Sequence, residues 1–260
     1  MDFLEEYYTL RDEDARLLSQ HGQVEYLTTM KYIHEYLRGN DGARILEVGA
    51  GTGRYSVALA KEGRAVAAVE LVAHNLEILR SKLDGTENIE VVQGNALDLS
   101  AYADGVFDLT LVLGPMYHLY TKEDKLRALR EAARVTKPGG VLMVAYCMNE
   151  ATIIQYVFVQ NHLQEVFEKS LIAPDWLARS DPSEVFELIR VEGINELNAA
   201  AGLRRLKLVA TDGATNYMRG VIDEMDAAAF RKWLDYHFAT CERQDLIGAS
   251  NHALDILRKE

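Results

Sequence analysis

The sequence predicts an α/β protein built on a doubly wound, mostly parallel sheet. Two observations predict it: short apolar runs alternate with helix-like stretches over residues 43–147, and a glycine-rich turn follows the first run. Strands that alternate with helices pair in parallel through right-handed crossovers. Ligands of such sheets bind beyond the carboxyl ends of the strands, where the strand order reverses. We therefore expect a ligand site at that edge.

The glycine-rich turn follows the first apolar run, residues 45–48, and leads into an amphipathic helix. It contains Gly49, Gly51 and Gly53, separated by small residues. Glycine permits positive φ and close approach of a ligand to the backbone, and a helix N-terminus offers unpaired N–H donors. The unit is typical of a site for a nucleotide-like ligand. The sixth position of a dinucleotide fingerprint counted from Gly49 is Arg54 rather than glycine, which disfavours NAD. If the three glycines are considered without the rest of the chain, a NAD-type turn or an ordinary tight turn is the alternative interpretation.

The ends of the next strands carry groups that a ligand can use. The second run, residues 65–69, is followed by Glu70, and an acid at this place can accept two hydrogen bonds from ribose hydroxyls. The third run, residues 89–93, ends in Gly94-Asn95-Ala96. The fourth run, residues 107–113, precedes Gly114. A helix over residues 126–135 then leads through Lys137-Pro138-Gly139-Gly140 into a fifth run, residues 141–144.

In this order, the motifs resemble those of the class I S-adenosylmethionine (SAM)-dependent methyltransferases, in their small-molecule, ubiquinone/menaquinone-type branch. The resemblance covers about residues 43–147. It implies a Rossmann-like, seven-stranded sheet, with a helix between successive strands up to residue 147 and an antiparallel last strand near residues 253–257. It also implies SAM as the cofactor, S-adenosylhomocysteine (SAH) as the product, and no metal.

The resemblance assigns the cofactor contacts residue by residue. An acid at the Glu47 position helps to hold the amino end of SAM, and the turn lies against its methionine part. Glu70 faces the ribose. Asn95 stands where the family usually has aspartate beside adenine, so its amide oxygen must accept the bond without a charge. The complete predicted set is Glu47, Gly49, Ala50, Gly51, Gly53, Glu70, Leu71, Asn95, Ala96, Leu113 and Gly114.

The chemistry of methyl transfer requires few side chains. The sulfonium leaves as a neutral thioether, so the protein must align the reactants and exclude water, and a base is needed only if the acceptor carries a proton. His118 is the candidate base, because it follows the fourth run and its ordinary pKa suits proton removal near neutral pH. Tyr117 is the candidate for orienting the acceptor. The alternative for both is simple packing against the helix start. Asp124 stands alone, so we expect no metal site.

Composition limits the classes of partner. The chain of 260 residues is 48% hydrophobic, enough for one buried core with an appendage. Its formal net charge is −12, which makes a nucleic-acid partner unlikely, since such partners select clustered basic residues. We expect no secretory signal, no membrane span and, with only Cys147 and Cys241, a cytoplasmic protein without disulfides.

The remaining segments predict a cap over the site. We expect N-terminal helices over residues 1–40 and a methyltransferase domain over residues 41–260 with helical inserts at about 150–190 and 214–247. A further helix is expected over residues 192–202 and a sixth strand over residues 206–210. The first insert is rich in large apolar residues, and a homodimer face is its alternative role.

The sequence thus predicts a methyltransferase acting on an O, N or S nucleophile of a small molecule. An RNA or protein methyltransferase is the alternative within enzymes. A SAM- or SAH-binding subunit without transferase activity is the alternative outside them. The acceptor itself has no motif in the sequence.

Overall fold

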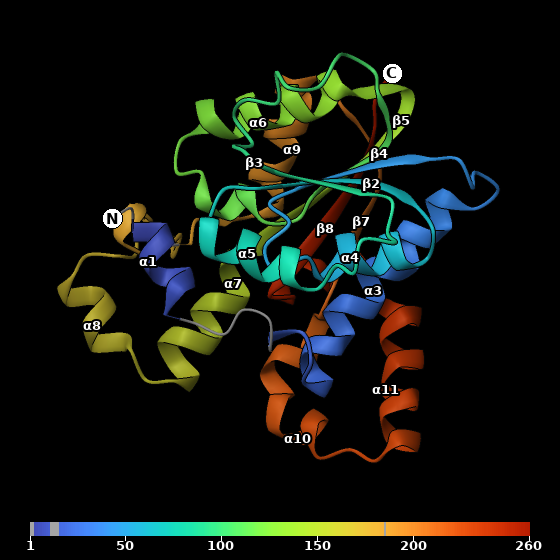
Figure 1. The fold of residues 1–260 in the computed structure, drawn as a ribbon. Coiled ribbons are helices and arrows are strands. Elements are labelled where there is room, and N and C mark those ends of the chain that lie inside the picture. Colours follow the sequence, from blue (N-terminus) through green and yellow to red (C-terminus); the bar gives the residue numbers. More distant parts are fainter. Residues whose placement is uncertain (1–2, 11–15, 185) are drawn as a thin grey trace.

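The computed structural model describes residues 3–10, 16–184 and 186–260, and a mixed, mostly parallel sheet forms its centre (Figure 1). The spatial order of the strands is β3-β2-β1-β4-β5-β8-β7, with the short β6 beside the end of β5. β8 is antiparallel to both β5 and β7, whereas the other pairs are parallel. The predicted sheet with an antiparallel last strand is therefore confirmed, and β6 is an addition to it. The strands are β1 (Arg44–Val48), β2 (Ala65–Glu70), β3 (Ile89–Gln93), β4 (Phe107–Val112), β5 (Thr136–Met148), β6 (Leu188–Ile189), β7 (Arg204–Ala210) and β8 (His252–Arg258).

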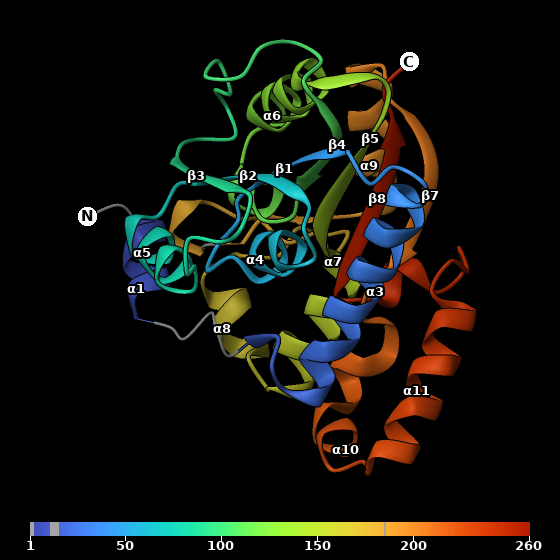
Figure 2. The same ribbon diagram turned by 45° about the vertical axis from the view of Figure 1, so that its right-hand side comes forward.

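Helices cover both faces of this sheet (Figures 1 and 2). One face carries α3 (Gln20–Leu37), α4 (Arg54–Lys61) and α5 (Ala73–Ser81), and the other carries α6 (Lys122–Val135) and α9 (Val191–Ala201). The strand order reverses at β1, which lies between β2 and β4. Side chains beyond the carboxyl ends of β1, β2 and β4 can therefore meet in one crevice.

The predicted helix between the third and fourth strands is wrong. Residues 94–106 form turns instead. Short polar side chains hold these turns, because the Asn95 carbonyl oxygen accepts from the Leu97 N–H at 2.9 Å and the Asp98 carboxylate accepts from the Ser100 N–H at 3.0 Å. Such side chain to backbone bonds compete with helix formation. Leu99 is buried in the core and anchors the segment without a helix.

The Pro-Gly-Gly segment lies within β5 rather than before it. Phe107 pairs with Thr136 and Leu109 pairs with Val141, so several residues of β5 bulge out between these pairs. Gly139 at φ 75° takes the left-handed conformation in this bulge. The strand therefore begins directly after α6, five residues earlier than the start of the predicted run.

The remaining helical segments come from the N-terminus and from the two long connections. Three parts of the predicted helical segments lie outside the described residues: residues 1–2 and 11–15 near the N-terminus, and Val185 in the first connection. None of the described helices has both the length and the apolar content needed to cross a bilayer. These segments are α1 (Phe3–Thr9), α7 (Asn149–Thr152), a π-helix (Ile153–Val159), α8 (Leu163–Glu168), α10 (Arg219–Asp223), α11 (Ala227–Thr240) and short 3₁₀ turns at Pro182–Glu184, Gly213–Met218 and Ile247–Ala249. A further 3₁₀ turn, Pro115–His118, follows β4.

Candidate active site

A cavity of about 350 Å³ opens at the carboxyl ends of β1, β2 and β4. It lies where the strand order reverses, which is the expected place for a ligand of this architecture. Most of the predicted cofactor residues line it, and so do both predicted catalytic residues. The predicted residues along its wall are Glu47, Gly49, Ala50, Gly51, Glu70, Leu71, Asn95, Ala96, Leu113, Gly114, Tyr117 and His118.

The glycine-rich turn wraps one side of the cavity. The N–H groups of Gly49 and Ala50 donate to the Val69 carbonyl at 2.8 and 3.0 Å, which fastens the turn to β2. Gly51 and Gly53 have φ values of 55° and 84°. Gly51 lines the cavity, whereas Gly53 begins α4 and packs away from it. The predicted role of Gly53 is therefore indirect: it shapes the turn.

Alanine at Gly51 and alanine at Gly53 are expected to have different effects. A Cβ at Gly51 meets nothing within 4 Å, so Gly51→Ala costs only about 1–2 kcal/mol of backbone strain but projects a methyl group where a ligand approaches. A Cβ at Gly53 lies 2.6 Å from Leu79 Cγ. Gly53→Ala should therefore lower the melting temperature more than Gly51→Ala, while Gly51→Ala should weaken SAH binding by about tenfold or more. Thermal unfolding and calorimetry on both variants check this, and equal melting temperatures would contradict it.

Glu70 links the turn to the end of β2. Its two carboxylate oxygens accept from the Gly51 N–H at 2.7 Å and from the Val72 N–H at 2.8 Å. Burial raises the pKa of Glu70, although these backbone hydrogen bonds act in the opposite direction. The Asn75 side chain and the Leu71 backbone also bond to this carboxylate, so ribose hydroxyls would share it with several donors of the protein. The carboxylate thus shapes the turn as well as facing the cavity, which sequence reasoning did not predict.

Glu47 lies deeper, at the end of β1. It is 1% exposed and accepts from the backbone N–H of Ser56 at 2.9 Å and from the Ser56 hydroxyl. Burial raises the pKa of Glu47 to about 8, against the hydrogen bonds from Ser56 that lower it. A buried carboxyl group of this kind gains from a neighbouring positive charge. The amino group of a methionine-like ligand would supply such a charge.

Asn95, which follows β3, also lines this cavity and is exposed. Its side-chain oxygen already accepts the Leu97 N–H, so one lone pair holds the turn and the other remains for a ligand. Ala96 and Leu71 add apolar surface on either side. This part of the cavity can therefore hold a flat aromatic ring mainly through van der Waals contacts rather than through a charged group.

His118 and Tyr117 lie at the mouth of the cavity, beside the N-terminal helix α1. The Tyr8 hydroxyl lies 2.8 Å from His118 Nε2, and the two rings meet edge to face. The Tyr117 hydroxyl donates to the Leu113 carbonyl at 2.8 Å, and burial raises the pKa of Tyr117. The contact between Tyr8 and His118 has no signal in the sequence, since nothing local joins residues 110 positions apart.

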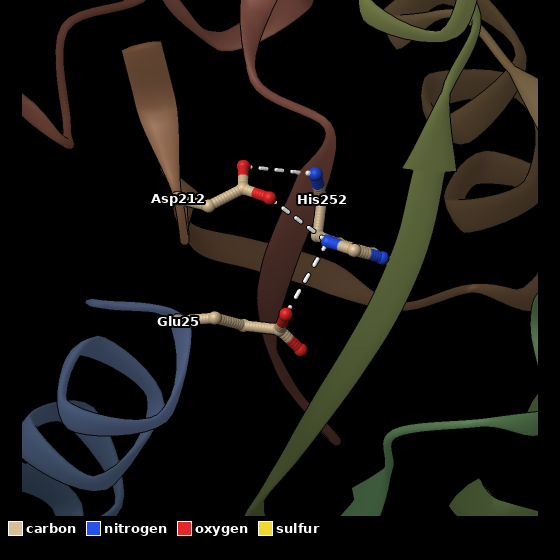
Figure 3. A group of neighbouring side chains, drawn as sticks. All are labelled: Glu25, Asp212 and His252. Carbon is tan, nitrogen blue, oxygen red and sulfur yellow. Dashed lines mark hydrogen bonds and ion pairs between the residues drawn. The ribbon is translucent and has the colours of Figure 1, made fainter. Parts of the chain in front are cut away.

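A second cavity of about 420 Å³ adjoins the first, and Tyr8, Arg16 and Tyr117 line both. Its wall holds Glu25 from α3, Asp212 after β7 and His252 at the start of β8 (Figure 3). Sequence reasoning missed all three residues. The only local signal was the position of Asp212 and His252 at the ends of two neighbouring strands.

The prediction that the chain has no metal site was based on the isolated position of Asp124 in the sequence. Asp124 lies in the first turn of α6, where the hydroxyl of the N-cap residue Thr121 accepts from its N–H at 3.1 Å and donates to its carboxylate at 2.8 Å. In the part of the chain that the structure describes, the ligand atoms of Glu25, Asp212 and His252 lie within 4.8 Å of one another. This group is the one place where the described side chains have the spacing of metal ligands.

Comparison with known proteins supplies a family for this geometry. Residues 46–144 match the sequence model of a family described as a methyltransferase domain. A demethylmenaquinone methyltransferase from Staphylococcus haemolyticus is 26% identical over 199 residues, which cover 72% of this chain and 80% of that protein. Another from Bacillus licheniformis is 28% identical over 149 residues, covering 54% of this chain and 62% of that protein, which is less than two thirds of its length.

Solved structures agree on the fold. The crystal structure of geranyl diphosphate C-methyltransferase from Streptomyces coelicolor contains Mg²⁺, geranyl diphosphate and S-adenosyl-L-homocysteine. It aligns with a TM-score of 0.59 and 12% identity, covering 90% of this chain and 79% of that chain. At this identity the likeness concerns the fold alone.

Proposed function

Since the chain belongs to the class I SAM-dependent methyltransferases, we propose that it moves a methyl group from SAM to an O, N or S nucleophile of a small molecule. The transfer is an in-line displacement, in which the nucleophile, the methyl carbon and the sulfur lie on one line. The sulfur leaves as the neutral thioether of SAH, so the displacement itself requires neither an acid nor a metal.

One observation carries this proposal: Glu47, the glycine-rich turn and Glu70 meet in the 350 Å³ cavity at the reversal of strand order. Glu47 would face the amino end of the cofactor and Glu70 its ribose, while Leu71, Asn95 and Ala96 would hold the adenine. Tyr117 and His118 lie at the mouth, next to the second cavity. The acceptor would enter from that side.

The named relatives do not fix the acceptor. The family match ends at residue 144, whereas the second cavity is lined by α3, residues 147–152 and residues around 212 and 252. A nucleic-acid acceptor is disfavoured by the net charge of −12. A binding subunit without transferase activity remains the alternative, and it would bind SAM without turning over any acceptor.

Titration calorimetry with SAM, SAH and NAD tests the cofactor. Micromolar binding of the sulfur compounds and none of NAD supports the proposal, and an acceptor screen with labelled methyl groups then tests transfer. Binding of NAD, or of none of the three, would overturn it. A cytoplasmic location is part of the same proposal, supported by the free thiols of Cys147 and Cys241.

His118→Ala is expected to slow methyl transfer with little change in SAH affinity. A positioned base contributes about 10²–10⁴-fold to such a rate, and His118 lies where the acceptor would meet the methyl group. His34→Ala is the matched control, because His34 pairs with Glu62 on the surface. Single-turnover rates with saturating SAM check the prediction. An unchanged rate in His118→Ala would leave this histidine only a packing role.

The first connection also bears on association. Phe158, Val159 and Phe167 are 52%, 66% and 55% exposed on the π-helix and α8. We propose that residues 150–190 and 214–247 cap the site, with a homodimer as the alternative use of these apolar side chains. Light scattering decides between them, since a cap leaves the monomer mass and a dimer face doubles it.

A further inference from the structure

The second cavity has one ionic wall. His252 Nδ1 lies 3.0 Å from Asp212 Oδ2 and 3.4 Å from Glu25 Oε2, so one ring nitrogen faces two carboxylates (Figure 3). Asp212 Oδ1 accepts from the Ser250 hydroxyl and from the backbone N–H groups of Asn251 and His252. These bonds fix the Asp212 carboxylate so that Oδ2 is turned towards His252.

The charged groups of this wall hold one another in their ionised forms. Burial alone would lower the pKa of His252, yet Glu25, Cys147 and Asp212 raise it well above its ordinary value. Burial would raise the pKa of both carboxyl groups, yet Arg16 and His252 hold the pKa of Glu25 below its ordinary value. His252 and the Ser250 hydroxyl do the same for the pKa of Asp212. Both carboxylates therefore stay ionised at this wall, and their oxygen atoms can accept hydrogen bonds from an ammonium head group.

Among the lining residues that the structure describes, the other charged groups are Arg16, Arg219 and His21. Arg16 donates to both oxygens of Glu25, at 2.8 and 3.3 Å. Arg219 is exposed and donates to the side-chain oxygen of Asn216, and His21 is paired with Asp223. Among the described residues, Asp212 Oδ2 is bonded to His252 Nδ1, and Glu25 Oε1 accepts a hydrogen bond from Arg16. Each oxygen can therefore accept one more hydrogen bond.

The same cavity has an aromatic wall, which is formed by Tyr7, Tyr8, Tyr117 and Phe186. The Tyr7 ring centroid lies 5.2 Å from that of Tyr8 and 5.5 Å from that of Phe186, and Tyr117 lies 5.9 Å from Phe186. Faces of such rings attract cations by about 0.5–2 kcal/mol. A cavity that is lined by both aromatic rings and ionised carboxylates fits an alkylammonium group.

We propose that the second cavity receives the methyl acceptor and that this acceptor is an amine, held between the aromatic wall and the carboxylates of Glu25 and Asp212. This inference rests on the proposed methyl transfer. The ammonium loses one proton to His118, the proposed base, and from there to water. The nitrogen lone pair then forms the N–C bond while the C–S bond breaks, and its electron pair stays on the sulfur of SAH.

A divalent cation is the competing occupant, since the three ligand atoms also have a suitable spacing. The amine is favoured because the Arg16 guanidinium is bonded directly to Glu25. A divalent ion would add two positive charges next to it, whereas an ammonium adds one.

The first test uses the full chain saturated with SAH. Calorimetric titrations compare 2-phenylethylamine with 2-phenylethanol and 3-phenylpropanoate, which have similar size and a neutral or negative head. The amine is expected to bind at least about tenfold more tightly than either, which corresponds to one charged hydrogen bond. Equal or tighter binding of the alcohol or the acid would overturn the amine assignment. Absent SAH binding would instead overturn the proposed function itself.

The second test uses variants. Glu25→Gln and Asp212→Asn should each weaken the amine by about tenfold or more and leave SAH affinity unchanged, because the cofactor pocket does not include either carboxylate. Asp223→Asn is the matched control, since Asp223 pairs with His21 in the same manner at 2.7 Å but lies outside the cavity lining. SAH titration of each variant reports whether it is folded. Mn²⁺ and Zn²⁺ are titrated separately as the competing occupants. If either ion binds tightly, displaces the amine and no longer binds to Glu25→Gln, the ionic wall is a metal site and the amine assignment fails.

Discussion

Replacing Glu70 by alanine is expected to weaken SAH binding about 100-fold, because hydrogen bonds to a charged group contribute about 1.5–3 kcal/mol each. The carboxylate would accept the ribose hydroxyls, and it also holds the N–H groups of Gly51 and Val72. Its loss therefore removes ligand contacts and loosens the turn that the ligand lies against. Calorimetry with SAH measures the effect.

Glu90→Ala is the matched control for Glu70. Glu90 is an exposed carboxylate on the neighbouring strand β3 and does not line the cavity. Its removal should leave SAH affinity unchanged. If Glu70→Ala also retains full affinity while its thermal unfolding is normal, the assignment of the ribose contact to Glu70 fails.

Replacing Asp255 by alanine is expected to lower the free energy of unfolding by about 3 kcal/mol, since removing one partner of a buried ion pair leaves the other unpaired. Asp255 is fully buried in β8. It accepts from Arg205 of β7 at 2.6 and 2.9 Å and from Asn198 of α9 at 2.6 Å. The side chain thus ties one helix and two strands together. Urea unfolding followed by circular dichroism measures the loss.

Asp245→Ala provides the comparison for Asp255. Asp245 also pairs with an arginine, Arg243, but its side chain is 62% exposed. Water screens such a pair, so its removal should change stability by less than about 1 kcal/mol. Similar losses for the two variants would mean that burial does not decide the contribution of these ion pairs.

The strands other than β6 were predictable from sequence because each contains a short run of mainly apolar residues that ends at a turn. The predicted β3, residues 89–93, matches to the residue, and β2 extends one residue further to Glu70. The helix expected within residues 94–106 failed for a local reason, since Asn95 and Asp98 bond to nearby backbone groups. The start of β5 was misjudged because a bulge keeps Pro138 and Gly139 within a strand.

The two parts of the site also differ in how far the sequence could predict them. The proposed cofactor side is encoded in continuous motifs at strand ends, so the sequence alone points to Glu47, Gly51 and Glu70. The proposed acceptor side is assembled from distant segments. Glu25 and His252 are 227 positions apart and meet only through tertiary packing. No periodicity or spacing in a single sequence records such a meeting.

The position of β8 has a consequence for the order of folding during synthesis. β8 separates β5 from β7, so β7 joins the sheet only through a strand made more than 40 residues later. While residues 252–258 are still inside the ribosome, β5 has an open edge and β7 has no strand to pair with. Unpaired strand edges recruit other chains. The nascent protein should therefore be most prone to aggregation, and most dependent on chaperones, in the interval between completion of β7 and emergence of β8.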